Sequence, residues 1–335
     1  MRVGLVLVVV AAPVAWARTS QVPAAGRGAV SSVVSNAVSS AILDARLLLQ
    51  DLKTLSADDM EGRVVDTPGG GRARAFVLKR FAESGVTTLG GAYTTAFTFG
   101  GRGGRVGQRR GVNVVGKIDG TSRRDRYIVL SAHYDHIGPR NGQVSNGADD
   151  NASGTAALFA AAAYFSVHRP ATSIIFAAFD AEEAGLQGSK AFVSQPPVPI
   201  GSIAINVNLD MIGRDPADKL FAVGVRLNPF LKPYIESVAA RAPVKLLMGH
   251  DGPGGRAGGP EEDWTNESDH ASFQRARIPA IYLGVEDFDQ HHEVTDDYET
   301  MSHDFYVRAV ETVIALIREF DAHVADILKA RAGGV

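Results

Sequence analysis

The chain has 335 residues, 45% of them hydrophobic, with a formal net charge of −3 and no cysteine. That length and hydrophobic content suffice to bury one large core, so a disordered chain is excluded as the default. The mixed charges form no basic stripe for a phosphate backbone, and we expect no nucleic-acid partner. Without cysteine, any bound metal must be held by His, Asp and Glu.

The first 17 residues have the pattern of a secretory signal peptide. Arg2 supplies a positive charge, residues 3–12 form an apolar run, and residues 15–17 (Ala-Trp-Ala) fit a small-x-small cleavage site. An uncleaved membrane anchor is the alternative, but this run falls short of the roughly 20 apolar residues that span a bilayer. We therefore predict cleavage, export and no stable membrane insertion. Residues 18–39 have no helical or alternating period and are predicted to be a linker.

Helices and then alternating strands and helices are predicted along the rest of the chain. Apolar residues at helical spacing predict a helix over 42–52, and a second helix is predicted over 72–81 after a Pro-Gly-Gly-Gly turn at 68–71. Short apolar runs rich in β-branched residues predict strands at 112–118, 127–132, 173–179, 203–209 and 280–283. Further helices are predicted at 152–166, 229–240 and 302–328. The alternation predicts a single α/β domain, with a mixed, largely parallel central sheet flanked by helices on both faces.

Unusual residues gather where the predicted strands end, which is the edge of such a sheet that binds ligands. The strand at 127–132 runs into His133 and Asp135, and this carboxylate can accept the imidazole proton and leave the other ring nitrogen for a metal. Asp149 and Asp150 follow just before a predicted helix. For these two residues, capping of that helix is the alternative to metal binding.

Three more strand ends carry carboxylates or imidazoles. Glu182 and Glu183 leave an extended segment in opposite directions, so one can bind metal while the other faces water. Asp210 ends an apolar run, where an unpaired carboxylate would be costly and a cation would remove that cost. His291 and His292 follow the last strand. The joint occurrence of these clusters predicts a pair of divalent metal ions.

Six sequence blocks, in this order, resemble the two-zinc exopeptidases of metallopeptidase family 28, which include bacterial leucyl aminopeptidases. The blocks are SAHYDHIG, NGADDNASG, FDAEEAGLQGS, NLDMIG, SDHASF and HHEVTDD, and MEGR near Met60 also looks like this family. The resemblance covers the chain from about residue 42 to the final helix. It implies the phosphorylase/hydrolase-like fold of zinc exopeptidases and a catalytic domain over residues 40–331. The direct passage from residue 111 to 133 implies that no protease-associated domain is inserted.

The resemblance also implies two Zn²⁺ ions per chain and a place for each ligand. Asp150 would be the carboxylate that bridges both ions. The remaining ligands would be His133 and Asp210 for one ion, and Glu183 and His292 for the other.

Residues around the ions would have supporting roles in the same family. Glu182 would be the general base, and Asp135 would support His133 from the side away from the metal. Asp296 would support His292 in the same way.

Other positions border the site or depart from the family. Asp269 and His270 belong to the SDHASF block, which borders the substrate pocket in relatives. His291 stands where many relatives have an aromatic residue before the last histidine ligand. Residues 264–267 are WTNE, whereas some relatives have a Tyr there that steadies the tetrahedral intermediate. The group with that role is therefore not assigned.

The sequence as a whole predicts a zinc-dependent aminopeptidase that acts on the N-termini of peptides or proteins, in the periplasm or outside the cell. A glutaminyl cyclase-like acyltransferase, which generally uses one zinc, is an alternative on the same fold. A carboxypeptidase is another, with Arg214 or Arg256 as a clamp for the terminal carboxylate. The alternative of another class is an inactive binding module, although every expected metal position is filled by a competent residue.

Overall fold

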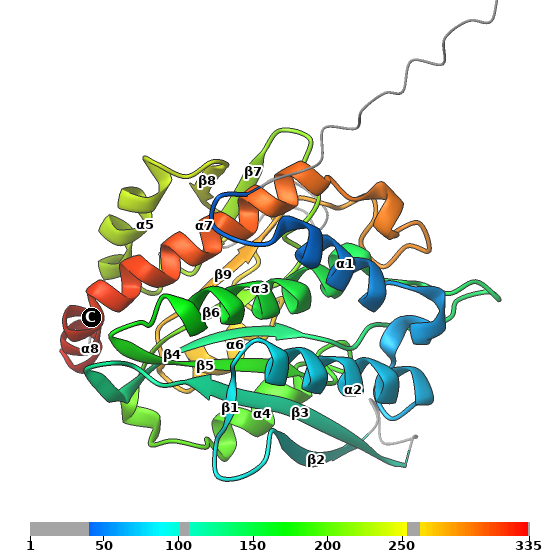
Figure 1. Cartoon of the computed structure of the whole chain (residues 1–335), viewed down its shortest axis with the longest axis horizontal. Coiled ribbons are helices and arrows are strands. Elements are labelled where there is room, and N and C mark those ends of the chain that lie inside the picture. Colours follow the sequence, from blue (N-terminus) through cyan, green and yellow to red (C-terminus); the bar gives the residue numbers. More distant parts are fainter. Residues whose placement is uncertain (1–39, 101–106, 253–261, 334–335) are drawn as a thin grey trace, which may run out of the picture. The chain divides into compact units, whose positions relative to one another are not determined.

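The computed structural model describes residues 40–100, 107–252 and 262–333 (Figure 1). The predicted signal peptide, residues 1–17, and the predicted linker, residues 18–39, lie outside the described residues. Among the helices in the described ranges, none combines the length and the apolarity that crossing a bilayer requires.

One mixed sheet organises the described part of the chain (Figure 1). Its nine strands are β1 (Thr87–Thr88), β2 (Thr94–Gly100), β3 (Gln108–Ile118), β4 (Arg123–His133), β5 (Thr172–Phe179), β6 (Ile203–Leu209), β7 (Lys219–Val223), β8 (Lys245–Met248) and β9 (Ala280–Gly284). The order is β1-β3-β5-β4-β6-β9-β7-β8, with β2 paired to β3. Strands β5, β4, β6 and β9 run parallel to one another, whereas β3 and β7 are antiparallel to this central group. The predicted mixed sheet is confirmed.

Helices cover both faces of the sheet, as predicted. They are α1 (Ala45–Leu55), α2 (Pro68–Glu83), α3 (Gly154–Val167), α4 (Gln187–Ser194), α5 (Lys232–Ala239), α6 (His270–Arg275), α7 (His303–Ala322) and α8 (Val324–Ala332). Leu130 of β4 points into the larger core under α1, α2, α3 and α7, and its neighbour Val129 points into the smaller core under α4 and α6. Alternate residues of the buried strands therefore serve opposite cores, which explains why these strands are apolar throughout.

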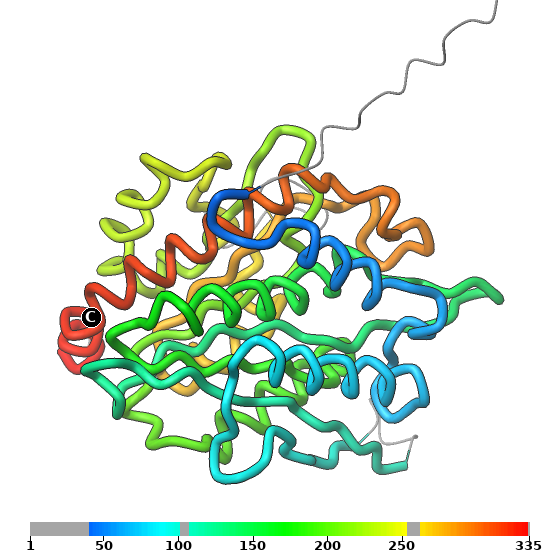
Figure 2. The backbone as a smooth tube through the Cα atoms, in the orientation of Figure 1, coloured from blue at the N-terminus to red at the C-terminus, as the bar shows by residue number. Residues whose placement is uncertain are grey.

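Two segments far apart in sequence close the larger core. Helices α1 and α7 lie side by side (Figure 2), and Ser40 Oγ donates a hydrogen bond of 2.5 Å to Glu311 Oε1.

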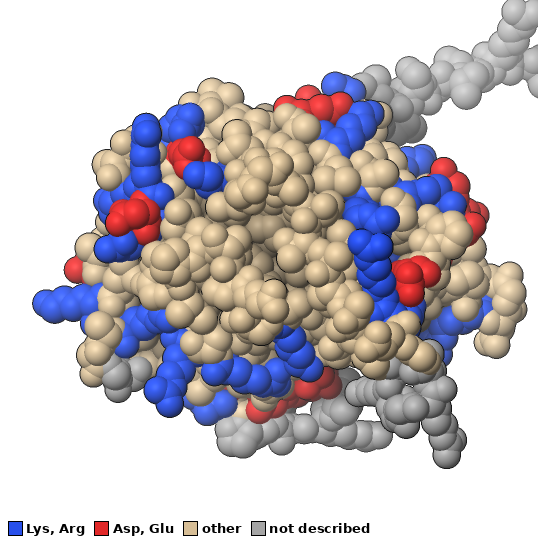
Figure 3. Space-filling model, turned by 90° about the horizontal axis from the view of Figure 1, so that it is seen from below, with Lys and Arg blue, Asp and Glu red and all other residues tan. Residues whose placement is uncertain are grey.

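On the face shown in Figure 3, basic side chains stand at separate positions near the margin, with uncharged residues across the middle.

The predicted turn at 68–71 is wrong, because these residues form the first turn of α2. Thr67 caps this helix by accepting a 3.2 Å hydrogen bond from Gly70 N, and Pro68 occupies the first turn, where its missing N–H costs nothing. A Cβ on Gly69 would lie 2.3 Å from Met60 O, and one on Gly70 would lie 2.3 Å from Val64 O. The glycines therefore allow α2 to pack closely against the 60–64 segment.

The predicted helix at 302–328 is two helices, α7 and α8, which are separated at His323. Strands β1, β2, β7 and β8 and helices α4 and α6 were not predicted. Strand β2 is mostly exposed and lies at the sheet margin, so it carries no apolar run to recognise.

Candidate metal centre

The predicted ligands lie together at the carboxyl edge of the parallel strands. His133 is the last residue of β4, and Asp210 follows β6. Asp150 comes from the connection between β4 and α3, Glu183 from the loop after β5, and His292 from the loop after β9. Because these strands are parallel, their carboxyl ends meet at one edge, and side chains from distant segments converge there.

The first ligand group consists of His133, Asp150 and Asp210, all of them buried. His133 Nε2 lies 3.4 Å from Asp150 Oδ1 and 3.2 Å from Asp210 Oδ1. Two ligand atoms bound to a tetrahedral zinc at about 2.05 Å are about 3.3 Å apart. The distances from His133 Nε2 to the two carboxylate oxygens match this separation between zinc ligands.

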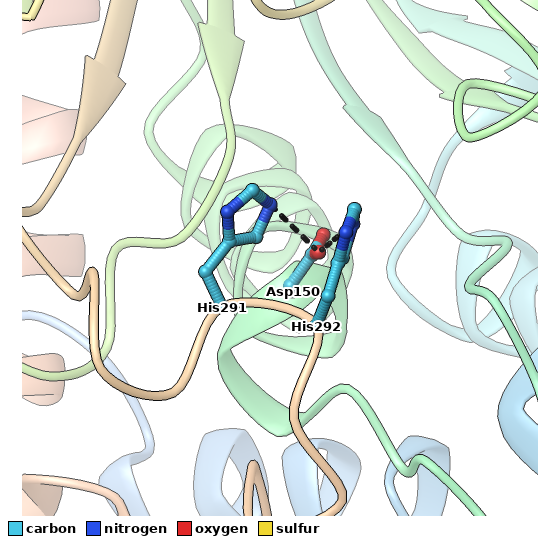
Figure 4. A group of neighbouring side chains, drawn as sticks. All are labelled: Asp150, His291 and His292. Atoms are coloured by element: carbon cyan, nitrogen blue, oxygen red, sulfur yellow. Dashed lines mark ion pairs between the residues drawn. The ribbon is translucent and has the colours of Figure 1, made fainter. Parts of the chain in front are cut away.

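The second ligand group consists of Asp150, Glu183 and His292 and lies around the other oxygen of Asp150. His292 Nε2 lies 3.2 Å from Asp150 Oδ2 and 3.0 Å from Glu183 Oε2. Figure 4 shows His291 and His292 both turned toward the Asp150 carboxylate, and His291 Nε2 lies 3.7 Å from Asp150 Oδ2. Asp150 therefore presents one oxygen to each group, as a bridging ligand does.

The donor set fits a divalent cation in each group. Asp150, Glu182, Glu183 and Asp210 line one cavity beside the imidazole of His292. Asp150 and Asp210 are buried and Glu182 and Glu183 are partly buried, and so many carboxylates withdrawn from water are costly unless a cation compensates their charge. Carboxylate and imidazole without thiolate form a ligand set that Zn²⁺ accepts.

Burial and neighbouring charges shift the pKa values of two carboxyl groups in opposite directions. Burial raises the pKa of Glu182 well above its ordinary value, and the nearby His133 opposes this rise only in part. Burial also acts to raise the pKa of Asp150, but the imidazoles of His136, His133 and His292 hold it well below the ordinary value. Asp150 is therefore a persistent anion, whereas Glu182 accepts a proton readily.

Asp135 contacts both His133, at the end of β4, and the backbone of Glu182 and Glu183. His133 Nδ1 lies 3.1 Å from the backbone oxygen of Asp135 and 3.6 Å from its Oδ1. The Asp135 carboxylate accepts hydrogen bonds from the backbone N–H groups of Glu182, at 3.0 Å, and Glu183, at 3.4 Å. This arrangement leaves His133 Nε2 facing the first ligand group.

Asp296 has partners that differ from the expected His292. Its carboxylate accepts hydrogen bonds from the backbone N–H groups of Asp149, at 2.9 Å, and Asp150, at 3.0 Å, and from Arg214 Nη2 at 2.7 Å. Within the described residues, no hydrogen bond joins it to His292. Asp296 therefore orients the segment that carries the bridging aspartate, a role that a chain position near His292 does not reveal.

Arg63, in the MEGR block, lies beneath the site, in a role that the sequence pattern does not reveal. Its side chain is fully buried and donates only to backbone oxygens, those of Tyr134 (2.9 Å), Leu55 (2.9 Å), Asn146 (2.5 Å), Gly147 (2.8 Å) and Asp150 (3.3 Å). Burial lowers the pKa of Arg63 to about 10, so the guanidinium stays charged at neutral pH. It is a fixed cation that ties the Asp150 segment to α1 and β4.

Asp269 and His270 are fully buried and do not line the cavity themselves. The charge of Asp269 adds to the rise in the pKa of Glu182, and burial raises the pKa of Asp269 itself to about 7. Burial lowers the pKa of His270 to about 3, so this imidazole is neutral. It stacks on Tyr282 with ring centroids 5.0 Å apart, and Tyr282 does line the cavity.

A cavity of about 370 Å³ opens beside the two ligand groups. Its lining combines the candidate ligands, Glu182 and further acidic residues with apolar and aromatic side chains. The apolar and aromatic lining residues are Leu186, Met211, Trp264, Tyr282, Val285 and Phe288. Trp264 is backed by His250, whose ring is stacked on it at 3.7 Å with an interplanar angle of 5°.

The sequence matches the model of the family described as "Peptidase family M28" over residues 113–317. A curated protein described as a probable zinc metalloprotease, from Pyrenophora tritici-repentis, is 33% identical over 108 residues, which are 31% of this chain and 25% of that protein. Another of that description, from Pyricularia oryzae, is 40% identical over 111 residues, which are 30% of this chain and 21% of that protein. The chain thus spans a quarter or less of the length of these relatives.

Solved structures with the same fold include BSAP, a zinc aminopeptidase from Bacillus subtilis, with a TM-score of 0.67 and 16% identity. A glutaminyl cyclase from Fimbriiglobus ruber has a TM-score of 0.66 and 19% identity. Each match covers 83% of this chain and 95% of the other. At such low identity, the likeness establishes the fold alone.

Proposed function

Because the chain belongs to peptidase family M28, we propose that it is an aminopeptidase that holds two zinc ions and removes N-terminal residues from peptides. The observation that carries this proposal is the division of Asp150 between the two ligand groups, with Oδ1 3.4 Å from His133 and Oδ2 3.2 Å from His292. A carboxylate shared in this way would hold two metal ions close together, as the chemistry of a two-metal hydrolase needs.

Glu182 is the general base and acid of the proposed reaction. Bound zinc would supply Lewis acidity toward the substrate carbonyl and lower the pKa of a water. Glu182 lines the cavity next to the ligands, and its raised pKa suits a carboxyl that takes a proton from the attacking water and then delivers it to the departing amine. Asp135 holds the Glu182 backbone through a 3.0 Å hydrogen bond, which keeps this carboxyl beside the first ligand group.

The charge of the cavity favours an N-terminal amine over a C-terminal carboxylate as the group recognised. Glu262 and Glu267 line it, together with Asp287, whose charge the neighbouring Arg214 compensates, and no Lys or Arg is among its lining residues within 107–252 and 262–333. Arg214, one candidate clamp for a carboxypeptidase, is bound to Asp287 and Asp296 instead. The other, Arg256, lies outside the described residues. A negative wall attracts a cationic amine, which supports the aminopeptidase assignment.

Export and the division of the chain are part of the same proposal. Residues 1–17 would be a signal peptide, residues 18–39 a linker and residues 40–331 the catalytic domain, without an inserted protease-associated domain. The peptidase would then act in the periplasm or outside the cell.

A glutaminyl cyclase is the second candidate, because a cyclase shares the fold over 83% of this chain. Metal content and substrate preference separate the two. The purified mature protein is analysed for zinc and assayed on a panel of aminoacyl-nitroanilides, before and after chelation and zinc return. An N-terminal glutaminyl peptide is included to detect cyclisation.

We expect two zinc ions per chain, cleavage of substrates with a free amine, no cleavage of their N-acetylated forms, and recovery of activity with zinc. One zinc with cyclisation of the glutaminyl peptide would identify a cyclase. Release of C-terminal residues would identify a carboxypeptidase, and metal binding without turnover of any substrate would favour the inactive binding module.

A further inference from the structure

His136 is an imidazole beside the second ligand group to which the proposed reaction gives no role. Its side chain is fully buried. Nδ1 lies 2.9 Å from Glu183 Oε1 and 3.6 Å from Asp150 Oδ2, and Nε2 lies 3.1 Å from Ser145 Oγ. Both ring nitrogens therefore have polar partners, and one partner is a candidate metal ligand.

The contacts of His136 join three loops of the site. Ser145 Oγ donates a 3.3 Å hydrogen bond to the backbone oxygen of Glu293, the residue after His292. The hydrogen bonds thus run from Glu183, after β5, through the loop after β4 to the loop after β9. The two segments that carry the ligands of the second group are connected through a single imidazole.

The ring of His136 has little room to turn. A Cβ added to Gly147 would lie 2.6 Å from Cγ and from Cδ2 of His136, so the ring packs directly against the Gly147 backbone. Gly147 has a φ of 56°, a conformation that favours glycine. This close approach holds the ring with Nδ1 facing Glu183.

We propose that His136 is a positioning residue for the second metal ion. An ionised carboxylate can only accept a hydrogen bond, so Nδ1 is the donor to Glu183 Oε1. With Oε1 occupied, Glu183 presents Oε2 to the metal, on the side where His292 Nε2 lies 3.0 Å away. Outer hydrogen bonds of this kind orient a ligand, and their loss typically weakens metal binding by about 10–100-fold.

The inference rests on the proposed two-zinc site, and a metal-binding assay tests both separately. The full mature chain is prepared as His136→Ala and as His136→Asn. Asparagine places an amide N–H near the position of Nδ1 but cannot reach Ser145. Ser145→Ala keeps the contact with Glu183 but removes the Nε2 contact and the hydrogen bond to Glu293, and His168→Ala changes an exposed histidine at the far end of α3. Zinc affinities are measured by competition with a chromogenic chelator, and the absorption spectrum of bound Co²⁺ reports the ligand geometry.

We expect one ion of His136→Ala to bind as in the unchanged protein and the other about 10–100-fold more weakly, with a changed Co²⁺ spectrum. His136→Asn should recover most of that affinity, and His168→Ala should behave as the unchanged protein. If His136→Asn bound the weaker ion no more tightly than His136→Ala, the imidazole would have only a packing role, which would overturn the inference. Loss of one whole ion in both would show that His136 is itself a ligand, which also overturns it. Unchanged zinc affinity in His136→Ala refutes the inference alone, whereas absence of zinc from the unchanged protein refutes the proposed function.

Discussion

Replacing Glu182 with glutamine separates catalysis from metal binding. Glutamine keeps the size of the side chain, and the 3.0 Å hydrogen bond from the backbone N–H of residue 182 to Asp135 does not involve the side chain that changes. The ligands of both groups are therefore undisturbed. The amide cannot take a proton from water, so the general acid–base contribution, typically about 10²–10⁴-fold, is lost. At about 1.36 kcal/mol per tenfold, the barrier rises by about 2.7–5.4 kcal/mol.

The assay for Glu182→Gln compares kcat, KM and zinc content on an aminoacyl-nitroanilide. We expect kcat to fall by the factor above, with zinc content unchanged and little change in KM. Burial raises the pKa of Glu182, and the base must be deprotonated to act, so kcat/KM of the unchanged enzyme should increase with pH through that pKa. The variant should lose this acid limb. Glu236→Gln, which changes an exposed glutamate of α5, is the matched control. Near-normal turnover by Glu182→Gln would refute its assignment as the general base.

Other changes test the scaffold and the metals. Arg63→Met removes donors to five buried backbone oxygens, of which Gly147 O keeps a 3.1 Å hydrogen bond from Ala152 N; at about 1–3 kcal/mol for each acceptor left without a partner, we expect no cooperative thermal unfolding transition. Arg63→Lys, with its charge and three donors kept, should retain a cooperative transition in calorimetry, at a Tm below that of the unchanged protein; a normal Tm for Arg63→Met would contradict this reasoning. Asp150→Ala should lose both zinc ions in elemental analysis, because both groups share that residue, and full retention of one ion would argue against a bridge. Chelation should lower Tm, since each site filled at 100 times its Kd adds about 2.7 kcal/mol to the free energy of unfolding; an unchanged Tm would mean that the folded chain holds no metal.

Candidate residues for the site could be selected from the sequence because their signals are local. A buried parallel strand is a short apolar run, and an Asp, Glu or His directly after it, such as His133 or Asp210, is recognisable without knowledge of the fold. The order of six family blocks then assigned a role to each position. In contrast, the Pro-Gly-Gly-Gly sequence at 68–71 indicated a turn, because the need for close packing against residues 60–64 is not visible in the local sequence.

The sequence by itself determined the class of the sheet and which strand ends carry the candidate ligands. Only the tertiary structure decided how the groups face one another: that Oδ1 of Asp150 faces His133 and Oδ2 faces His292, and that Asp296 binds the Asp150 backbone rather than His292. Arg63 and His136 gained their roles in the same way, from hydrogen bonds to residues up to 87 positions away. The direction of a side chain and the partner of a hydrogen bond depend on segments that meet only after folding, and the spacing of residues along the chain does not contain them.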